Sequence, residues 1–199
     1  MMNVLTGFKF IAEQIQHDEE TGDHTFMFGF EESYGYLVKS FVRDKDAVQA
    51  VLLLTEVAAH FKNEGKTLYD GLQALYAKHG YFLEKTISVT VAGLEGPQKI
   101  KAFLDGLRAS VPTSFGGLKV ALAQDFAVNE QKDANGVVSE IGLPPSNVLH
   151  YILDDGSWIA VRPSGTEPKI KFYIGAKANS EEAAKEKVAA LQADLEKLQ

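Results

Sequence analysis

The clearest pattern in the chain is an apolar stripe of helical period over residues 46–61. Apolar side chains recur there every three or four positions, as on one face of an α-helix. The stripe consists of Ala47, Val51, Leu54, Ala58 and Phe61. Asp44 or Asp46 can cap the start of this helix. A further helix is expected after Thr67, which forms a variant of the capping box with Asp70.

The residues before this helix predict little sheet. A short helix is expected within residues 4–15, a polar loop over 16–23 and a short buried strand over 25–30. Residues 1–84 thus combine about three helices with one or two short strands. So few strands cannot bury the apolar faces of those helices. We therefore interpret residues 1–84 as a partial α/β domain whose beginning is missing.

Strand patterns dominate the second half. Apolar and polar residues alternate over residues 86–92, 118–126 and 170–174, and residues 149–153 and 158–161 form a hairpin around Asp154-Asp155-Gly156. One helix is expected from Pro97 and a last helix from Ser180. Residues 85–199 are therefore predicted to be an α+β C-terminal domain, an antiparallel sheet with helices packed on one face.

Composition excludes several classes of function. The net charge of −7 argues against a nucleic-acid or anionic-membrane partner, and no apolar run is long enough to span a membrane. The chain has no cysteine, which excludes disulfides, thiolate metal sites and cysteine nucleophiles and suits the cytoplasm. No metal site is expected, because the five histidines lack metal-ligand spacing and no paired-aspartate motif is present.

Residues 162–171 form a basic cluster in this acidic chain. The Arg162 guanidinium can hold two phosphate oxygens, Ser164 and Thr166 add hydroxyls, and Gly165 leaves the backbone N–H groups accessible. Lys171 shares one strand face with Lys169. The alternative is a hairpin turn shaped by Pro163 and Gly165, and these residues by themselves leave both interpretations open.

A second polar cluster, Glu31-Glu32-Ser33, follows the strand expected over residues 25–30. Carboxylates beside a hydroxyl suit the hydroxyl groups of a sugar. Taken alone, these residues favour an ordinary acidic loop.

Together the clusters resemble the α-D-phosphohexomutase superfamily of phosphoglucomutases and phosphomannomutases. The run Arg162-Pro-Ser-Gly-Thr-Glu-Pro168 is similar to the phosphate-binding loop of its fourth domain. Gly29-Phe-Glu-Glu-Ser-Tyr-Gly35 is similar to the sugar-recognition loop of its third domain, and Thr6-Gly7-Phe8-Lys9 to an earlier segment of that domain. The resemblance implies domain III over residues 1–84 and domain IV over residues 85–199.

The resemblance also implies roles for individual residues. Gly7, Glu31 and Ser33 are expected to bind the sugar, and the phosphate that is not being transferred is expected at Arg162, Ser164, Gly165, Thr166 and Lys171. Enzymes of this superfamily interconvert hexose 1-phosphate and hexose 6-phosphate through a phosphoserine and a bisphosphate intermediate. The wording Tyr34-Gly35 favours the phosphoglucomutase-like branch over phosphoglucosamine mutases, but glucose and mannose are not distinguished.

Two motifs of the superfamily are absent from this sequence, the active-site serine loop and the aspartate-rich magnesium loop. The chain therefore resembles a C-terminal fragment without catalytic residues, and we expect it to be inactive alone. Mg²⁺ and hexose 1,6-bisphosphate are implied for the full-length enzyme, with no cofactor bound by this chain. The expected partners are a hexose phosphate and the missing N-terminal domains of the same chain. A stand-alone, non-catalytic phosphosugar-binding module and a purely structural domain are the alternatives.

Overall fold

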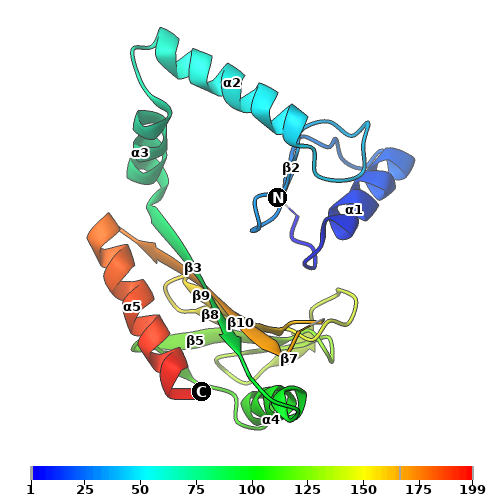
Figure 1. Cartoon of the computed structure of the whole chain (residues 1–199), viewed down its shortest axis with the longest axis vertical. Coiled ribbons are helices and arrows are strands. Elements are labelled where there is room, and N and C mark those ends of the chain that lie inside the picture. The colour runs from blue at the N-terminus through cyan, green and yellow to red at the C-terminus, as the bar shows by residue number, and fades with distance from the viewer. Residues whose placement is uncertain (1, 166, 199) are drawn as a thin grey trace. The chain divides into compact units, whose positions relative to one another are not determined.

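A computed structural model describes residues 2–165 and 167–198 of the chain (Figure 1). It divides into two compact units, Met1–Leu75 and Tyr76–Gln199. Among the described residues, no helix combines the length and the apolar character needed to cross a membrane. The two units are described separately below.

The first unit is mainly helical, with one very small antiparallel sheet. Its elements are α1 (Phe8–Thr21), β1 (Gly29–Phe30), β2 (Tyr36–Leu37), α2 (Ala47–Asn63) and α3 (Leu68–His79), the last of which runs across the boundary between the units. Three helices and two short strands confirm the predicted content. A small core forms around Phe8, Ile15 and Leu37.

Helix α1 is longer than predicted, because residues 16–21, expected to be loop, continue it. Polar residues four apart support the extra turns: the Gln14 and Gln16 amides donate to Asp18 and Glu20. The helix ends only at Gly22, whose φ of 74° closes the last turn with an N–H bond to Asp18 O. Polarity alone therefore gave the wrong end for this helix.

The predicted starts of α2 and α3 are confirmed. Asp46 caps α2 by accepting hydrogen bonds from the N–H groups of Val48 and Gln49 at 2.8 and 3.2 Å. Thr67 and Asp70 form the capping box of α3, since Thr67 Oγ1 accepts from Asp70 N while Asp70 Oδ2 accepts from Thr67 N.

The apolar stripe of α2 is not buried. No residue of this helix is buried, and the side chains of Val48, Val51 and Leu54 are 80, 64 and 56% exposed. Two strands of two residues each supply too little surface to cover a helix of this length. This agrees with the prediction that residues 1–84 form only part of an α/β domain.

The second unit is built on an eight-stranded sheet in which every pair is antiparallel. The strand order is β3-β10-β9-β8-β5-β6-β7, with β4 paired to β5. The strands are β3 (Tyr81–Thr90), β4 (Ser114–Phe115), β5 (Leu118–Asp125), β6 (Glu130–Asp133), β7 (Val138–Glu140), β8 (Leu149–Leu153), β9 (Trp158–Pro163) and β10 (Lys169–Ala178). Strand β3 begins at Tyr81, ahead of the boundary that the sequence placed between residues 84 and 85.

Two helices, α4 (Gly96–Ala109) and α5 (Glu181–Leu198), pack against one face of this sheet (Figure 1). They contribute Leu104 and Leu191 to a core in which Val161 on β9 and Phe172 on β10 are fully buried. The ring of Phe103 meets that of Phe172 edge to face at 6.0 Å. An α+β unit with its helices on one face is therefore confirmed. We call the opposite side the uncovered face, because neither helix of this unit packs on it.

Candidate ligand-binding site

The β9–β10 hairpin places two cations side by side on the uncovered face. Arg162 on β9 and Lys171 on β10 are direct cross-strand partners. Their chain neighbours Val161 and Phe172 are fully buried in the core, so both cationic side chains leave the opposite face. Directly opposed residues of an antiparallel pair have Cβ atoms about 4.5–5.5 Å apart.

Nothing in the described part of the chain neutralises this pair. Lys169 forms an ion pair with Glu167 at 2.9 Å, whereas neither Arg162 nor Lys171 has an acidic partner among the described residues. Like charges placed directly opposite each other destabilise a sheet. A bound anion would remove this repulsion, which makes the pair a candidate anion site.

The loop between the two strands is also an ordered turn. Ser164 N donates to Lys169 O at 2.8 Å, and Ser164 Oγ accepts from Glu167 N at 3.3 Å. Gly165 is exposed, and a Cβ added there would meet no atom within 4 Å, so a ligand can approach this backbone. Thr166, the remaining predicted residue of this loop, lies outside the described residues. The same loop can therefore form a hairpin turn and also bind a ligand.

A third strand adds a residue that the sequence analysis missed. Ser88 on β3 is the partner of Lys171 on its other side, in a row with Arg162. The available signal was the alternation of β3, which places Thr86, Ser88 and Thr90 on its polar side. Sequence alone could not show that this strand pairs with β10.

Helix α4 begins close to the same loop. Val91 N donates to Pro168 O at 2.9 Å, which ties the end of β3 to the loop. A Cβ added at Gly96 would lie 2.3 Å from Val91 O and 3.2 Å from Pro168 Cβ. Only a glycine therefore allows the first turn of α4 to approach this closely.

The Glu31–Ser33 loop in the first unit joins the strands β1 and β2. The loop is closed by a 2.9 Å bond from Glu31 N to Gly35 O, and Tyr34 at its tip has a φ of 65° and is 86% exposed. Glu31 is half-buried and Ser33 is exposed. A Cβ on the buried Gly35 would lie 2.5 Å from Glu31 Oε1 and 2.6 Å from Lys45 Cδ, so both side chains pack over this glycine.

Lys45 lies near Glu31 and forms an ion pair with Asp44 at 2.9 Å. The hydrogen bond to Asp44 raises the pKa of Lys45, and the carboxylate of Glu31 adds a smaller contribution in the same direction. The same bond lowers the pKa of Asp44. The side chains of Glu31 and Lys45 thus lie close together over Gly35.

The first turn of α2 holds this loop in place. Gln49 Oε1 accepts from the N–H groups of Val38 and Lys39 at 3.2 and 2.7 Å, and Gln49 Nε2 donates to Asp46 Oδ2 at 3.0 Å. Asp46 N in turn donates to Tyr36 O at 2.8 Å. The cap of α2 thus also fixes the strand that follows the loop, a role the sequence analysis did not assign.

Gly7 lies at the start of α1 with a φ of 123°, and its carbonyl accepts from Phe10 N at 3.0 Å.

The predicted site residues are divided between the units. Gly7, Glu31 and Ser33 belong to the first, and Arg162, Ser164, Gly165 and Lys171 belong to the second.

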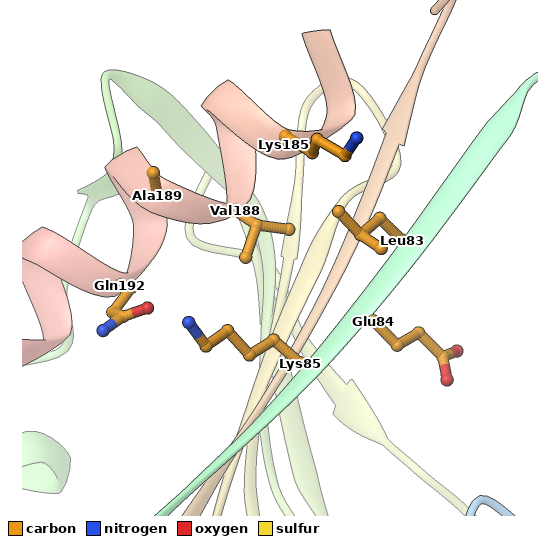
Figure 2. A pocket seen from close by; sticks show the side chains of 7 residues that line it. All are labelled: Leu83, Glu84, Lys85, Lys185, Val188, Ala189 and Gln192. Atoms are coloured by element: carbon orange, nitrogen blue, oxygen red, sulfur yellow. The ribbon is translucent and has the colours of Figure 1, made fainter. Parts of the chain in front are cut away.

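A separate hollow of about 270 Å³ lies between β3 and α5 (Figure 2). Its walls combine Leu83 and Val188 with the lysines Lys85 and Lys185. It contains none of the predicted site residues, and Lys185 is paired with Glu181 at 2.6 Å. No group of three histidine, aspartate or glutamate side chains in the described part of the chain is placed to hold a metal ion.

Comparison with known proteins identifies the family. Residues 1–79 match the model "Phosphoglucomutase/phosphomannomutase, alpha/beta/alpha domain III" and residues 118–193 match "Phosphoglucomutase/phosphomannomutase, C-terminal domain". The chain belongs to the phosphoglucomutase/phosphomannomutase family. The superfamily resemblance seen in the sequence is thereby confirmed for both halves of the chain.

Curated members of this family include phosphoglucomutases of Staphylococcus. That of S. epidermidis strain RP62A is 46% identical over 172 residues, covering 86% of this chain and 31% of its own length. That of S. aureus strain bovine RF122 is 44% identical over 191 residues, covering 94% of this chain and 34% of its own. The chain thus spans about a third of the length of these relatives.

A solved structure shares the fold. The open form of pp63/parafusin, a phosphoglucomutase from Paramecium, superposes with a TM-score of 0.62 at 21% identity. The match covers 96% of this chain and 31% of the parafusin chain.

Proposed function

We propose that this chain is the substrate-recognition portion of a phosphoglucomutase or phosphomannomutase, an intramolecular phosphotransferase that interconverts hexose 1-phosphate and hexose 6-phosphate. It acts together with further domains of the same enzyme, which supply the phosphoserine. We place this function in the cytoplasm, which the cysteine-free composition supports. The observation that carries the proposal is the uncompensated Arg162–Lys171 pair on the uncovered face of a family member.

In this proposal the hairpin binds the phosphate that is not being transferred. The Arg162 guanidinium offers a planar pair of N–H donors, and Lys171 adds a second charge. Ser164 and the accessible backbone at Gly165 complete the cradle, together with Thr166. These donors would bind the phosphate group and make no contact with the sugar. Such a site can accept either phosphate of a bisphosphate, as the proposed reaction requires.

The loop of the first unit binds the sugar in this proposal. The Glu31 carboxylate accepts hydrogen bonds from sugar hydroxyls, and the exposed Ser33 hydroxyl both donates and accepts. Gly7 has no side chain, so the sugar can approach the backbone closely there. We assign Mg²⁺ and hexose 1,6-bisphosphate to the proposed full-length enzyme, because the family resemblance implies them.

Binding of hexose phosphate to the 199-residue chain tests the recognition role. We expect glucose 1-phosphate and glucose 6-phosphate to shift the amide resonances of Arg162, Ser164 and Lys171 in ¹H–¹⁵N NMR titrations. Arg162→Ala is expected to weaken this binding about tenfold or more, because charge-assisted hydrogen bonds are lost. Unchanged affinity in that variant would remove Arg162 from the site.

Activity tests the division of labour. The 199-residue chain is expected to give no conversion of glucose 1-phosphate to glucose 6-phosphate in a coupled assay, and measurable conversion would contradict the proposal. When the chain is joined to the preceding domains of the S. epidermidis phosphoglucomutase, we expect activity that Arg162→Ala lowers. If the chain binds phosphosugar but never supports turnover in such a fusion, the stand-alone binding module is the better description.

A further inference from the structure

Three neighbouring strands align three side chains in one row on the uncovered face of the second unit. The row runs from Arg162 on β9 through Lys171 on β10 to Ser88 on β3. Ile87 and Val89, on either side of Ser88, pack against the core. The alternation of the strand therefore turns the Ser88 side chain toward the same face as the two cations.

Ser88 is available to a ligand. It is exposed, and its hydroxyl makes no hydrogen bond to any residue that the structure describes. Its Cβ lies about 4.5–5.5 Å from that of Lys171, as for any directly opposed pair. The Ser88 hydroxyl can therefore donate a hydrogen bond to an anion that the nearby ammonium group of Lys171 attracts.

Side-chain length gives Ser88 a distinct role. The long side chains of Arg162 and Lys171 can bend toward an anion placed at several points along the row. The hydroxyl oxygen of a serine is bonded directly to Cβ. The hydroxyl of Ser88 therefore stays close to the backbone of β3. An anion that touches all three side chains must therefore lie on the β3 side of Lys171.

We propose that Ser88 is a third ligand of the phosphate, donating its hydroxyl to an oxygen of the group held by Arg162 and Lys171. This proposal rests on the proposed function of the hairpin and makes it more specific. A tetrahedral phosphate offers several acceptor oxygens, so one can face the guanidinium, one the ammonium and one the hydroxyl. Strand β3 thereby becomes part of the binding site and fixes where the phosphate sits.

The test is a titration of the 199-residue chain with inorganic phosphate, followed by ¹H–¹⁵N NMR at constant ionic strength. Ser88→Ala is expected to weaken phosphate binding about threefold to tenfold, and Ser88→Thr, which keeps the hydroxyl, to restore most of it. Thr86→Val is the matched control. It removes a hydroxyl from the same face of β3, one row further along and opposite Tyr173, and is expected to leave the affinity unchanged.

Ser88→Asp separates a binding role from a structural one. It sets a carboxylate opposite Lys171, so phosphate binding should be lost while the melting temperature stays equal or rises. A purely structural role would instead lower stability in both Ser88→Ala and Ser88→Asp.

The two proposals fail in different ways. If Arg162→Ala weakens phosphate binding but Ser88→Ala does not, Ser88 is not a ligand and the hairpin site stands. If the unmodified chain shows no phosphate-dependent shifts at Arg162 and Lys171, both proposals fall.

Discussion

The indole ring of Trp158 lies over Gly175, its cross-strand partner on the uncovered face. A Cβ added to this glycine would lie 2.2 Å from the Cε2 and Nε1 atoms of the ring. Trp158 also meets the imidazole of His150 edge to face at 5.6 Å. A glycine in the middle of β10 is thus required by the ring above it, although glycine weakens strands in general.

Gly175→Ala should therefore destabilise the second unit by about 1–3 kcal/mol, the usual cost of forcing extra volume into a packed site. Because Trp158 is the only tryptophan in the chain, its fluorescence in denaturant unfolding reports the change directly. Gly106→Ala in α4 is the control. A Cβ there meets nothing within 4 Å, and we expect a gain of about 0.5–1 kcal/mol from helix propensity. Equal stability of Gly175→Ala and the unmodified chain would show that the ring moves away at no cost.

The Arg162–Lys171 pair predicts an anion-dependent stability. Lys171→Glu replaces a repulsive cross-strand pair with an attractive one, so we expect a gain of about 0.2–1 kcal/mol in low-salt chloride buffer. The same variant should lose the extra stabilisation that phosphate gives over chloride at equal ionic strength. Thermal unfolding in the two buffers measures both effects.

Lys85→Glu makes the same change of charge on the helix-covered side of β3, where Lys85 faces Ile174. It should leave the difference between phosphate and chloride intact. If this control loses the difference as well, phosphate acts through overall charge and not through the pair.

His150 predicts how stability depends on pH. Its Nδ1 group donates to Gln124 Oε1 at 2.8 Å, since Gln124 Nε2 is already used to donate to Gln131. Burial lowers the pKa of His150 from 6.5 to about 4. Between these values the unfolded state binds the proton and the folded state does not, so stability falls as pH drops from about 6.5 to about 4.

The loss should amount to about 3 kcal/mol and should stop below pH 4, where both states are protonated at this site. His150→Gln, which keeps a donor toward Gln124, is expected to flatten the curve in this window. Carboxylates with lowered pKa values, such as Asp155 and Asp194, act at lower pH, below their ordinary value of 3.8. An unchanged curve in His150→Gln would mean that another group titrates in this range.

Gln49 predicts a local effect in the segment that follows the Glu31–Ser33 loop of the first unit. Gln49→Leu removes the acceptor of the Val38 and Lys39 N–H groups, which should cost about 1–2 kcal/mol in local opening. Hydrogen exchange at those two amides should speed up, while exchange in β9 and β10 stays as it was. Gln192→Leu in α5, whose amide donates to the exposed Glu196 carboxylate four residues on, is the control and should change neither.

Local features were accessible from the sequence where neighbouring residues determine them. The caps at Asp46 and at Thr67 with Asp70 satisfy N–H groups only a few positions away, so spacing predicted the starts of α2 and α3. The end of α1 and the length of β1 were not predicted. Polar side chains are compatible with helix and with loop, so the end of α1 was settled by the turn at Gly22. The length of β1 was settled by its pairing with β2.

The candidate site shows the same division. The chemistry of Arg162, Ser164 and Gly165 could be inferred from residue types in one loop, and the comparisons place that loop in a phosphoglucomutase/phosphomannomutase domain. The position of Lys171 opposite Arg162 required the register of β9 and β10. Ser88 required the further pairing of β10 with β3, a strand distant in the sequence.

Sequence patterns predicted the five helices, the starts of α2 and α3 and the strands β3, β5, β8, β9 and β10, and they singled out two loops as candidate ligand sites. The short strands β2, β4, β6 and β7 were not predicted. The predicted features depend on side-chain period and on hydrogen bonds between near neighbours. The tertiary structure was needed to show that Arg162, Lys171 and Ser88 share one row and that no residue of α2 is buried. Strand pairing and burial depend on contacts between distant segments that form together, and no local pattern of residues specifies them.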